Sequence, residues 1–197
     1  MQSIQTVSEN TIYVGASDRR LAKFENLFPI PRGVSYNAYV ILDEKTALLD
    51  TADASVGAQF LENVAAALDG RKLDYLIVDH MEPDHAAMIE AVLVRWPDLR
   101  LVVNAKTLPM LKMYFPTDSA AFDDALVVKE GDTLDLGKHK LTFVMAPMVH
   151  WPEVMTAYEE TEKILFSADA FGRFGSLERT ARAPWVPQAR RYYYNII

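Results

Sequence analysis

The stretch that decides the fold of this chain reads Tyr75-Leu76-Ile77-Val78-Asp79-His80-Met81-Glu82-Pro83-Asp84-His85. Its first four residues form a short apolar run of the kind that builds a buried strand. The polar residues that follow lie where that strand ends. Strand ends that lead into loops are where α/β-type folds commonly place their chemistry. We therefore expect a functional site directly after this strand.

Four potential metal ligands, His80, Glu82, Asp84 and His85, fall within six residues of this loop. Alternate residues of an extended segment point the same way, so positions 80, 82 and 84 can converge. Pro83 restricts the loop. The alternative is that Asp84 is a helix N-cap and Glu82 a solvated loop residue. Because the whole chain has only four histidines, such a dense group favours a metal site.

Two later residues repeat this arrangement. His150 follows an apolar strand predicted over 141–145, and Asp169 follows another over 164–167. Taken alone, His150 could equally be a packed histidine, and Asp169 a turn or cap residue. Three such loops suggest one shared site. The fourth histidine, His139, stands between two lysines at the start of a predicted hairpin, and we expect it to be solvated.

The rest of the chain predicts a mixed α/β domain. Period-two and short apolar runs predict strands over 12–15, 36–42, 46–50, 101–104, 125–128, 133–136, 140–145, 156–159 and 164–167. Helical spacing predicts helices over 55–68, 84–94, 106–115 and 185–197, with Pro116 ending the third. The pattern suggests an αββα sandwich, two sheets with helices outside.

The charge, the cysteine count and the apolar runs of the chain argue against several classes of protein. The 197 residues carry a net charge of −7 and no Lys/Arg-rich run, which argues against a nucleic-acid partner. Cysteine is absent, so thiolate zinc sites and iron–sulfur clusters are excluded. The N-terminus lacks a signal-peptide pattern, and no apolar run approaches the roughly 18 residues of a membrane span. We expect a cytoplasmic protein without a membrane partner.

The motif HxExDH, residues 80–85, resembles the HxHxDH signature of the metallo-β-lactamase superfamily with glutamate in place of the second histidine. That substitution is similar to the flavodiiron proteins (A-type flavoproteins), which reduce dioxygen to water or nitric oxide to nitrous oxide. The stretches 33–40, 47–51, 150–153 and 165–172 also look like this family. The resemblance runs from about residue 10 to the end.

The resemblance implies two non-haem irons. By this resemblance His80, Glu82 and His150 would hold one iron, Asp84 and His85 would lie at the second, and Asp169 would bridge the two. In some family members the histidine matching His85 is turned away from the metal. A ligand set that mixes histidine and carboxylate suits iron, whereas an all-histidine set is typical of hydrolytic zinc sites. Zinc could still take the place of iron here.

Two departures from the family pattern bear on function. A last histidine ligand is expected about sixty residues beyond the bridging aspartate, and no histidine follows Asp169. Residues 1–197 also contain no stretch that resembles the flavodoxin domain, which binds FMN in this family. We therefore expect residues 1–197 to be a C-terminally incomplete diiron domain that binds no FMN, depends on an external flavin- or rubredoxin-type electron donor, and forms a homodimer. The alternatives are a zinc-dependent hydrolase of the same fold and a metal-binding remnant without catalysis.

Overall fold

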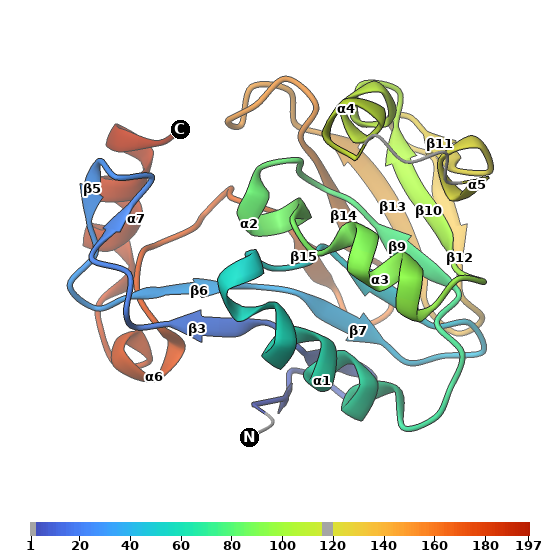
Figure 1. The fold of residues 1–197 in the computed structure, drawn as a ribbon, viewed down its shortest axis with the longest axis horizontal. Helices are drawn as coiled ribbons and strands as arrows, with labels where there is room; N and C mark the ends of the chain where they lie inside the picture. The colour runs from blue at the N-terminus through green and yellow to red at the C-terminus, as the bar shows by residue number, and fades with distance from the viewer. Residues whose placement is uncertain (1–2, 116–119) are drawn as a thin grey trace.

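A computed structural model describes residues 3–115 and 120–197, and its centre is two stacked sheets (Figure 1). The larger sheet has the order β1-β2-β7-β8-β9-β10-β11. Its strands are β1 (Gln5–Thr6), β2 (Thr11–Tyr13), β7 (Tyr39–Ile41), β8 (Ala47–Leu49), β9 (Tyr75–Ile77), β10 (Arg100–Asn104) and β11 (Leu126–Val128). Strands β8 to β11 pair in parallel, whereas β7 pairs antiparallel with both β2 and β8.

The smaller sheet is an antiparallel meander. Its strands, in spatial order, are β12 (Thr133–Asp135), β13 (Lys140–Met145), β14 (Met155–Glu159) and β15 (Ile164–Phe166). Two short ribbons lie apart from these sheets: β3 (Ala16–Asp18) pairs with β6 (Val34–Tyr36), and β4 (Lys23–Phe24) pairs with β5 (Phe28–Pro29). Its strands are therefore neighbours both in sequence and in space, and the longest connection is the loop 146–154 between β13 and β14.

Helices fill the outer layer and the C-terminal end. They are α1 (Gly57–Leu68), which follows a 3-10 turn at Ala54–Val56, α2 (Pro83–Ala86), α3 (Ile89–Arg95), α4 (Thr107–Tyr114), α5 (Ala120–Asp123), α6 (Leu177–Thr180) and α7 (Trp185–Asn195). Helices α1 and α3 cover one face of the larger sheet, and α6 and α7 lie beside the β3–β6 and β4–β5 ribbons (Figure 1). No helix in the described ranges is long and apolar enough to cross a membrane.

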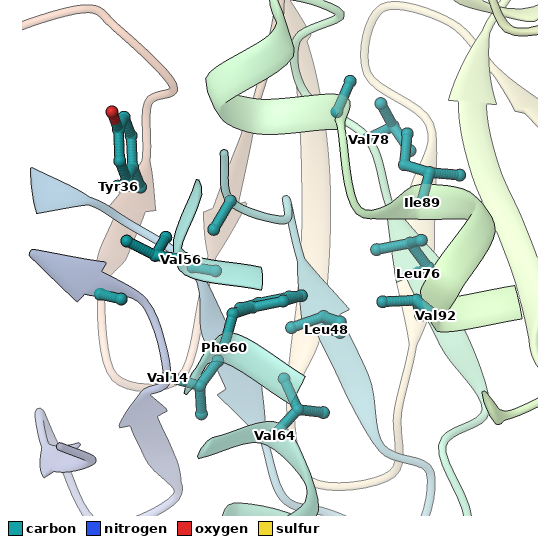
Figure 2. Packing of buried hydrophobic residues seen from close by; sticks show 14 of the residues in the cluster. Val14, Tyr36, Leu48, Val56, Phe60, Val64, Leu76, Val78, Ile89 and Val92 are labelled. Atoms are coloured by element: carbon teal, nitrogen blue, oxygen red, sulfur yellow. The ribbon is translucent and has the colours of Figure 1, made fainter. Parts of the chain in front are cut away.

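Two hydrophobic clusters hold the layers together. One lies between the helices and the larger sheet, where Phe60 of α1 and Val92 of α3 pack over Leu48 and Leu76 (Figure 2). The other lies between the two sheets and contains Ile77. Successive residues of one strand thus face different clusters, because side chains alternate across a strand. Strands buried on both faces read as continuous apolar runs, as the run beginning at Tyr75 does.

The strand predicted over 36–42 is divided in the structure. Val34–Tyr36 leaves the larger sheet to pair with β3, and Tyr39–Ile41 pairs with β2 and β8. The apolar pattern continues through both pieces because Tyr36 and Val40 are both buried. Periodicity reports burial but does not report which strand is the partner.

The helix predicted over 84–94 is also divided, into α2 and α3. The carbonyl oxygen of His85 accepts hydrogen bonds from the backbone N–H and the hydroxyl of Thr51, at 2.8 and 2.6 Å. A continuous helix would offer that oxygen to residue 89 instead. The Thr51 contacts end α2 and connect the His80 loop to β8.

The expectation for His139 is wrong. Its side chain is buried, and its backbone N–H and Nδ1 lie 2.6 and 2.8 Å from Oδ2 of Asp43. This pair joins the β7–β8 turn to the β12–β13 hairpin, and the flanking lysines are exposed while the ring points inward. The predicted helix stop at Pro116 lies outside the described residues.

Candidate metal centre

The predicted ligands lie in loops at one edge of both sheets. The His80 motif follows β9, His150 lies in the loop between β13 and β14, and Asp169 follows β15. Asp50, directly after β8, donates its backbone N–H to the carbonyl oxygen of Ile77. The parallel pairing of β8 and β9 thus brings two loops together, and the stacked second sheet supplies the other two. The structure brings all six predicted residues into this region.

The first group consists of His80, Glu82, His150 and Asp169. Each offers one ligand atom, and these four atoms all lie within 4.8 Å of one another. Nε2 of His150 is 2.9 Å from Oε2 of Glu82 and 3.1 Å from Oδ2 of Asp169. Nε2 of His80 is 3.4 Å from the same Glu82 oxygen. Two imidazoles and two carboxylates facing one point form a candidate cation site.

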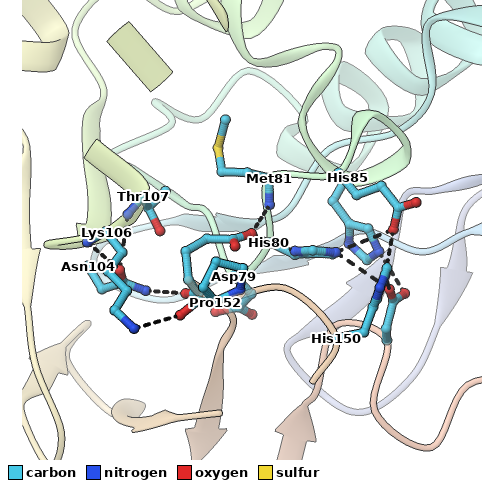
Figure 3. Close-up of polar contacts among 12 residues, drawn as sticks. Asp79, His80, Met81, His85, Asn104, Lys106, Thr107, His150 and Pro152 are labelled. Atoms are coloured by element: carbon cyan, nitrogen blue, oxygen red, sulfur yellow. Dashed lines mark hydrogen bonds and ion pairs between the residues drawn. The ribbon is translucent and has the colours of Figure 1, made fainter. Parts of the chain in front are cut away.

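The second group consists of Asp84, His85 and Asp169, again within 4.8 Å of one another. Nε2 of His85 is 3.1 Å from Oδ1 of Asp169 and 3.9 Å from Oδ2 of Asp84. His85 is therefore turned into the cluster (Figure 3). Asp169 belongs to both groups through different oxygens, since Oδ2 faces His80 and His150 while Oδ1 faces His85. This is the geometry that a bridging carboxylate requires.

Sequence reasoning missed two buried carboxylates behind the histidines. Oε1 of Glu153 is 2.7 Å from Nδ1 of His80, and Oδ2 of Asp50 is 2.9 Å from Nδ1 of His85. Both contacts leave Nε2 of the ring facing the cluster. Only the position of Glu153, three residues after His150, and that of Asp50, at a strand end, could have pointed to them. Neither spacing indicates a contact with a histidine.

A third missed residue is Glu25, which lies in the turn between β4 and β5. The hydrogen bond between Glu25 and Glu82, together with burial, raises the pKa of the Glu25 carboxyl to about 7. Glu25 has a φ of 48° and Asn26 one of 58°, as the two central residues of a tight hairpin require. The β4–β5 hairpin thus adds a carboxyl at the rim of the cluster, far from it in sequence.

The charges of the cluster compensate one another. Burial acts to raise the pKa of Glu82, but hydrogen bonds with His150 and His80 outweigh it and lower the pKa to about 2. Burial acts to lower the pKa of His150, but contacts with Asp169 and Glu82 raise it to about 10. Burial raises the pKa of Asp84 to about 7. The pKa shifts of Glu82 and His150 thus have one cause, the close approach of carboxylates and imidazoles within the cluster.

Several buried ligand atoms lack hydrogen-bond partners. Within the described residues these include Nε2 of His80, Oε1 of Glu82 and Oδ1 of Asp84. An unsatisfied buried polar atom costs about 1–3 kcal/mol, and more if it is charged. A metal ion between the two groups would satisfy these atoms together. The residues present therefore fit a pair of metal ions, and their donors are the nitrogen and oxygen atoms that iron accepts.

The loops that carry the ligands contain strained backbone. Asp50, Met148, Ala168 and Phe171 all have positive φ, between 46° and 68°. Non-glycine residues adopt this region at a cost and cluster at functional sites. All four lie within two residues of a predicted ligand or contact one directly.

A cavity of about 220 Å³ reaches the second group. Asp84, His85 and Asp169 line it, together with the buried Tyr192 of α7 and Phe171. This is space for a small molecule beside the second group. Of the three consecutive tyrosines in α7, Tyr192 lines this cavity together with the candidate ligands.

The sequence matches the profile of the family described as ODP family beta lactamase over residues 34–195. The chain belongs to this family. It is 35% identical to an anaerobic nitric oxide reductase flavorubredoxin of Citrobacter koseri over 97% of its length, and 34% identical to a nitric oxide reductase of Moorella thermoacetica over the same share. It spans 40% of the first relative and 49% of the second.

Solved structures agree. The fold matches rubredoxin oxygen:oxidoreductase from Desulfovibrio gigas with a TM-score of 0.91 at 31% identity, covering 98% of this chain and 49% of that one. It matches the flavodiiron protein from Giardia intestinalis with a TM-score of 0.88 at 26% identity, covering 100% and 48%. The expected metallo-β-lactamase-like fold of flavodiiron type is confirmed. The assignment of individual metal ligands stays a prediction.

Proposed function

We propose that this chain is a diiron oxidoreductase domain that reduces dioxygen to water or nitric oxide to nitrous oxide. The observation that carries the proposal is the shared position of Asp169, whose two oxygens face two separate ligand groups. A carboxylate in this position could be shared by two metal ions that act together. The names of the relatives, nitric oxide reductase and oxygen:oxidoreductase, point to the same two gases.

In this proposal the residues divide into two ligand sets. His80, Glu82 and His150 would hold one iron, Asp84 and His85 would hold the other, and Asp169 would be shared between them. Two ferrous ions bound there would supply two electrons, enough for two nitric oxide molecules to become nitrous oxide and water with two protons. Dioxygen needs four electrons and four protons to become two waters, so two further electrons must come from outside.

The chain's own residues prepare the site for a small uncharged gas. Phe171 and Tyr192 place aromatic rings in the lining of the cavity beside the second group. Asp169 is buried, and only 14% of the Asp84 side chain is exposed. The low dielectric around them strengthens their attraction for a cation. In this proposal these residues would hold the metals, and the cavity would take a diatomic ligand.

The remaining parts of the proposal concern partners. We propose an external flavin- or rubredoxin-type donor, a homodimer and a cytoplasmic location, each of which rests on the resemblance and on the kinds of proteins that match. No observation in the described residues favours the zinc hydrolase. Glu82 supplies a carboxylate where the hydrolytic signature has histidine.

Metal analysis and gas consumption test the proposal. Protein produced in iron-supplemented medium without added zinc should contain about two irons per chain. After anaerobic reduction it should consume dioxygen or nitric oxide in proportion to its iron. Two zincs per chain with hydrolytic turnover would overturn the proposal. In addition, Glu82→His should shift metal preference toward zinc, and unchanged iron selectivity would show that this carboxylate does not determine the metal.

A further inference from the structure

We propose that Glu153 is a positioning residue for the first metal ion, acting through His80. This inference rests on the proposed metal binding and deepens it. Oε1 of Glu153 accepts a hydrogen bond from Nδ1 of His80 at 2.7 Å and another from the backbone N–H of Met81 at 2.9 Å. Both side chains are fully buried. The carboxylate thus sets the position of the loop and the orientation of the ring.

The contact also decides which ring nitrogen is available. With its proton on Nδ1 and directed at Glu153, His80 presents Nε2 to Glu82 and Asp169. That Nε2 is buried and has no hydrogen-bond partner in the part of the chain that the structure describes. A carboxylate behind a metal-binding histidine fixes its tautomer and raises its basicity. An anion buried at this distance also favours the more highly charged state of a metal.

Glu153 is itself held from a separate element. Its carbonyl oxygen accepts a hydrogen bond from the side chain of Asn104, at the end of β10. Oδ1 of Asn104 in turn accepts hydrogen bonds from the backbone N–H groups of Lys106 and Thr107, where α4 begins. Nζ of Lys106 is 3.0 Å from the carbonyl oxygen of Pro152. The start of α4 therefore holds the segment that carries Glu153.

His150 has a different environment. Its Nε2 faces Glu82 and Asp169, and its side chain is 14% exposed, compared with 0% for His80. No hydrogen bond to its Nδ1 occurs among residues 3–115 and 120–197. The two histidines of the first group are thus unequal. We infer that His80 is the rigid ligand and that changes at Glu153 act on the metal through it.

The test compares Glu153→Gln with Glu159→Gln. Glutamine keeps the size of the side chain and removes its charge. Glu159 is the matched control, because it is also fully buried and its carboxylate accepts two backbone N–H groups, from Thr161 and Glu162, away from the cluster. Anaerobic competition with a chelator measures Fe(II) affinity, a redox titration measures the iron potential, and thermal unfolding of the metal-free proteins measures stability.

We expect Glu153→Gln to weaken Fe(II) binding about 10–100-fold and to raise the iron potential, as loss of a partner behind a ligand does. Glu159→Gln should lower thermal stability and leave both metal readouts unchanged. Equal affinity and potential in Glu153→Gln and wild type would overturn the inference, as would an equal loss in both variants. Wild-type protein that binds no iron pair would instead overturn the proposed function.

A second measurement needs no variant. In Zn(II)-loaded wild-type protein with ¹⁵N-labelled histidine, NMR should show His80 with a slowly exchanging proton on Nδ1 and the metal on Nε2. The opposite assignment, with the metal on Nδ1, would contradict the role of Glu153 even if Glu153→Gln failed to fold.

Discussion

Nε2 of His85 lies 3.1 Å from Oδ1 of Asp169, although 84 residues separate them in the sequence. The other oxygen of the same carboxylate faces His80 and His150. One side chain therefore connects the His80 loop, the β13–β14 loop and the loop after β15. The properties of the site should depend more strongly on Asp169 than on any single histidine.

Asp169→Asn should lower the iron content from about two per chain to one or fewer. The amide keeps the shape of the side chain but has only one oxygen and no charge, so it cannot bridge two cations. Elemental analysis after desalting measures the result. Asp98→Asn, at an exposed position after α3, is the control and should retain the wild-type content. Two irons in the Asp169 variant would show that this carboxylate is not shared.

Removal of the metals should lower stability. The ligand atoms come from loops of both sheets, so the metals bind the folded chain far better than the unfolded one. Free metal at a hundred times its dissociation constant adds about 2.7 kcal/mol to the free energy of unfolding. Thermal unfolding with Fe(II) and with a chelator measures this difference. Identical melting temperatures would contradict metal binding by the folded chain.

Thr51→Val should destabilise the fold and disturb the metal cluster. The hydroxyl of Thr51 donates to the carbonyl oxygen of His85 in a buried setting, and its loss should cost about 1–3 kcal/mol. Because this contact ends α2 next to a predicted ligand, Fe(II) affinity should fall too. Urea unfolding and chelator competition measure the two effects. Thr133→Val, on an exposed strand position, should change neither; unchanged affinity in Thr51→Val would show that the α2 break does not position the site.

Asp43→Asn should destabilise the protein by about 1–3 kcal/mol at pH 7, because it removes a charged acceptor of two hydrogen bonds from His139. Burial acts to raise the pKa of Asp43, but hydrogen bonds from His139 outweigh it and lower the pKa to about 2. A carboxyl whose pKa is lower in the folded state stabilises the fold above its unfolded pKa, about 3.9.

The free energy of unfolding of wild type should therefore exceed that of Asp43→Asn by its full amount above about pH 4. This difference should shrink as the pH falls toward 2. Denaturant unfolding at several pH values measures this trend. A difference that stays constant from pH 7 to pH 2 would show that the Asp43 charge does not contribute.

Local pattern predicted most strands and helices but not their interruptions. Helical spacing continues from residue 84 to 94, and the break in the middle arises from Thr51, a residue more than thirty positions earlier. The burial of His139 also arises from a contact with a residue that is distant in the sequence. Its two lysine neighbours indicate solvent, whereas Asp43 from another hairpin holds the ring inside.

The sequence by itself determined which residues are the candidate metal ligands, because His80, Glu82, Asp84 and His85 are neighbours and because His150 and Asp169 follow apolar strands. Those are local properties, set by side-chain chemistry and by the alternation of buried positions. Only the tertiary structure decided how the candidate ligands divide into two groups. The stacking of two sheets places Asp169 between two groups, and Glu153 and Asp50 behind two histidines. Contacts between these loops depend on how the two sheets pack. The spacing of residues along the chain does not encode the distance between loops that different strands carry.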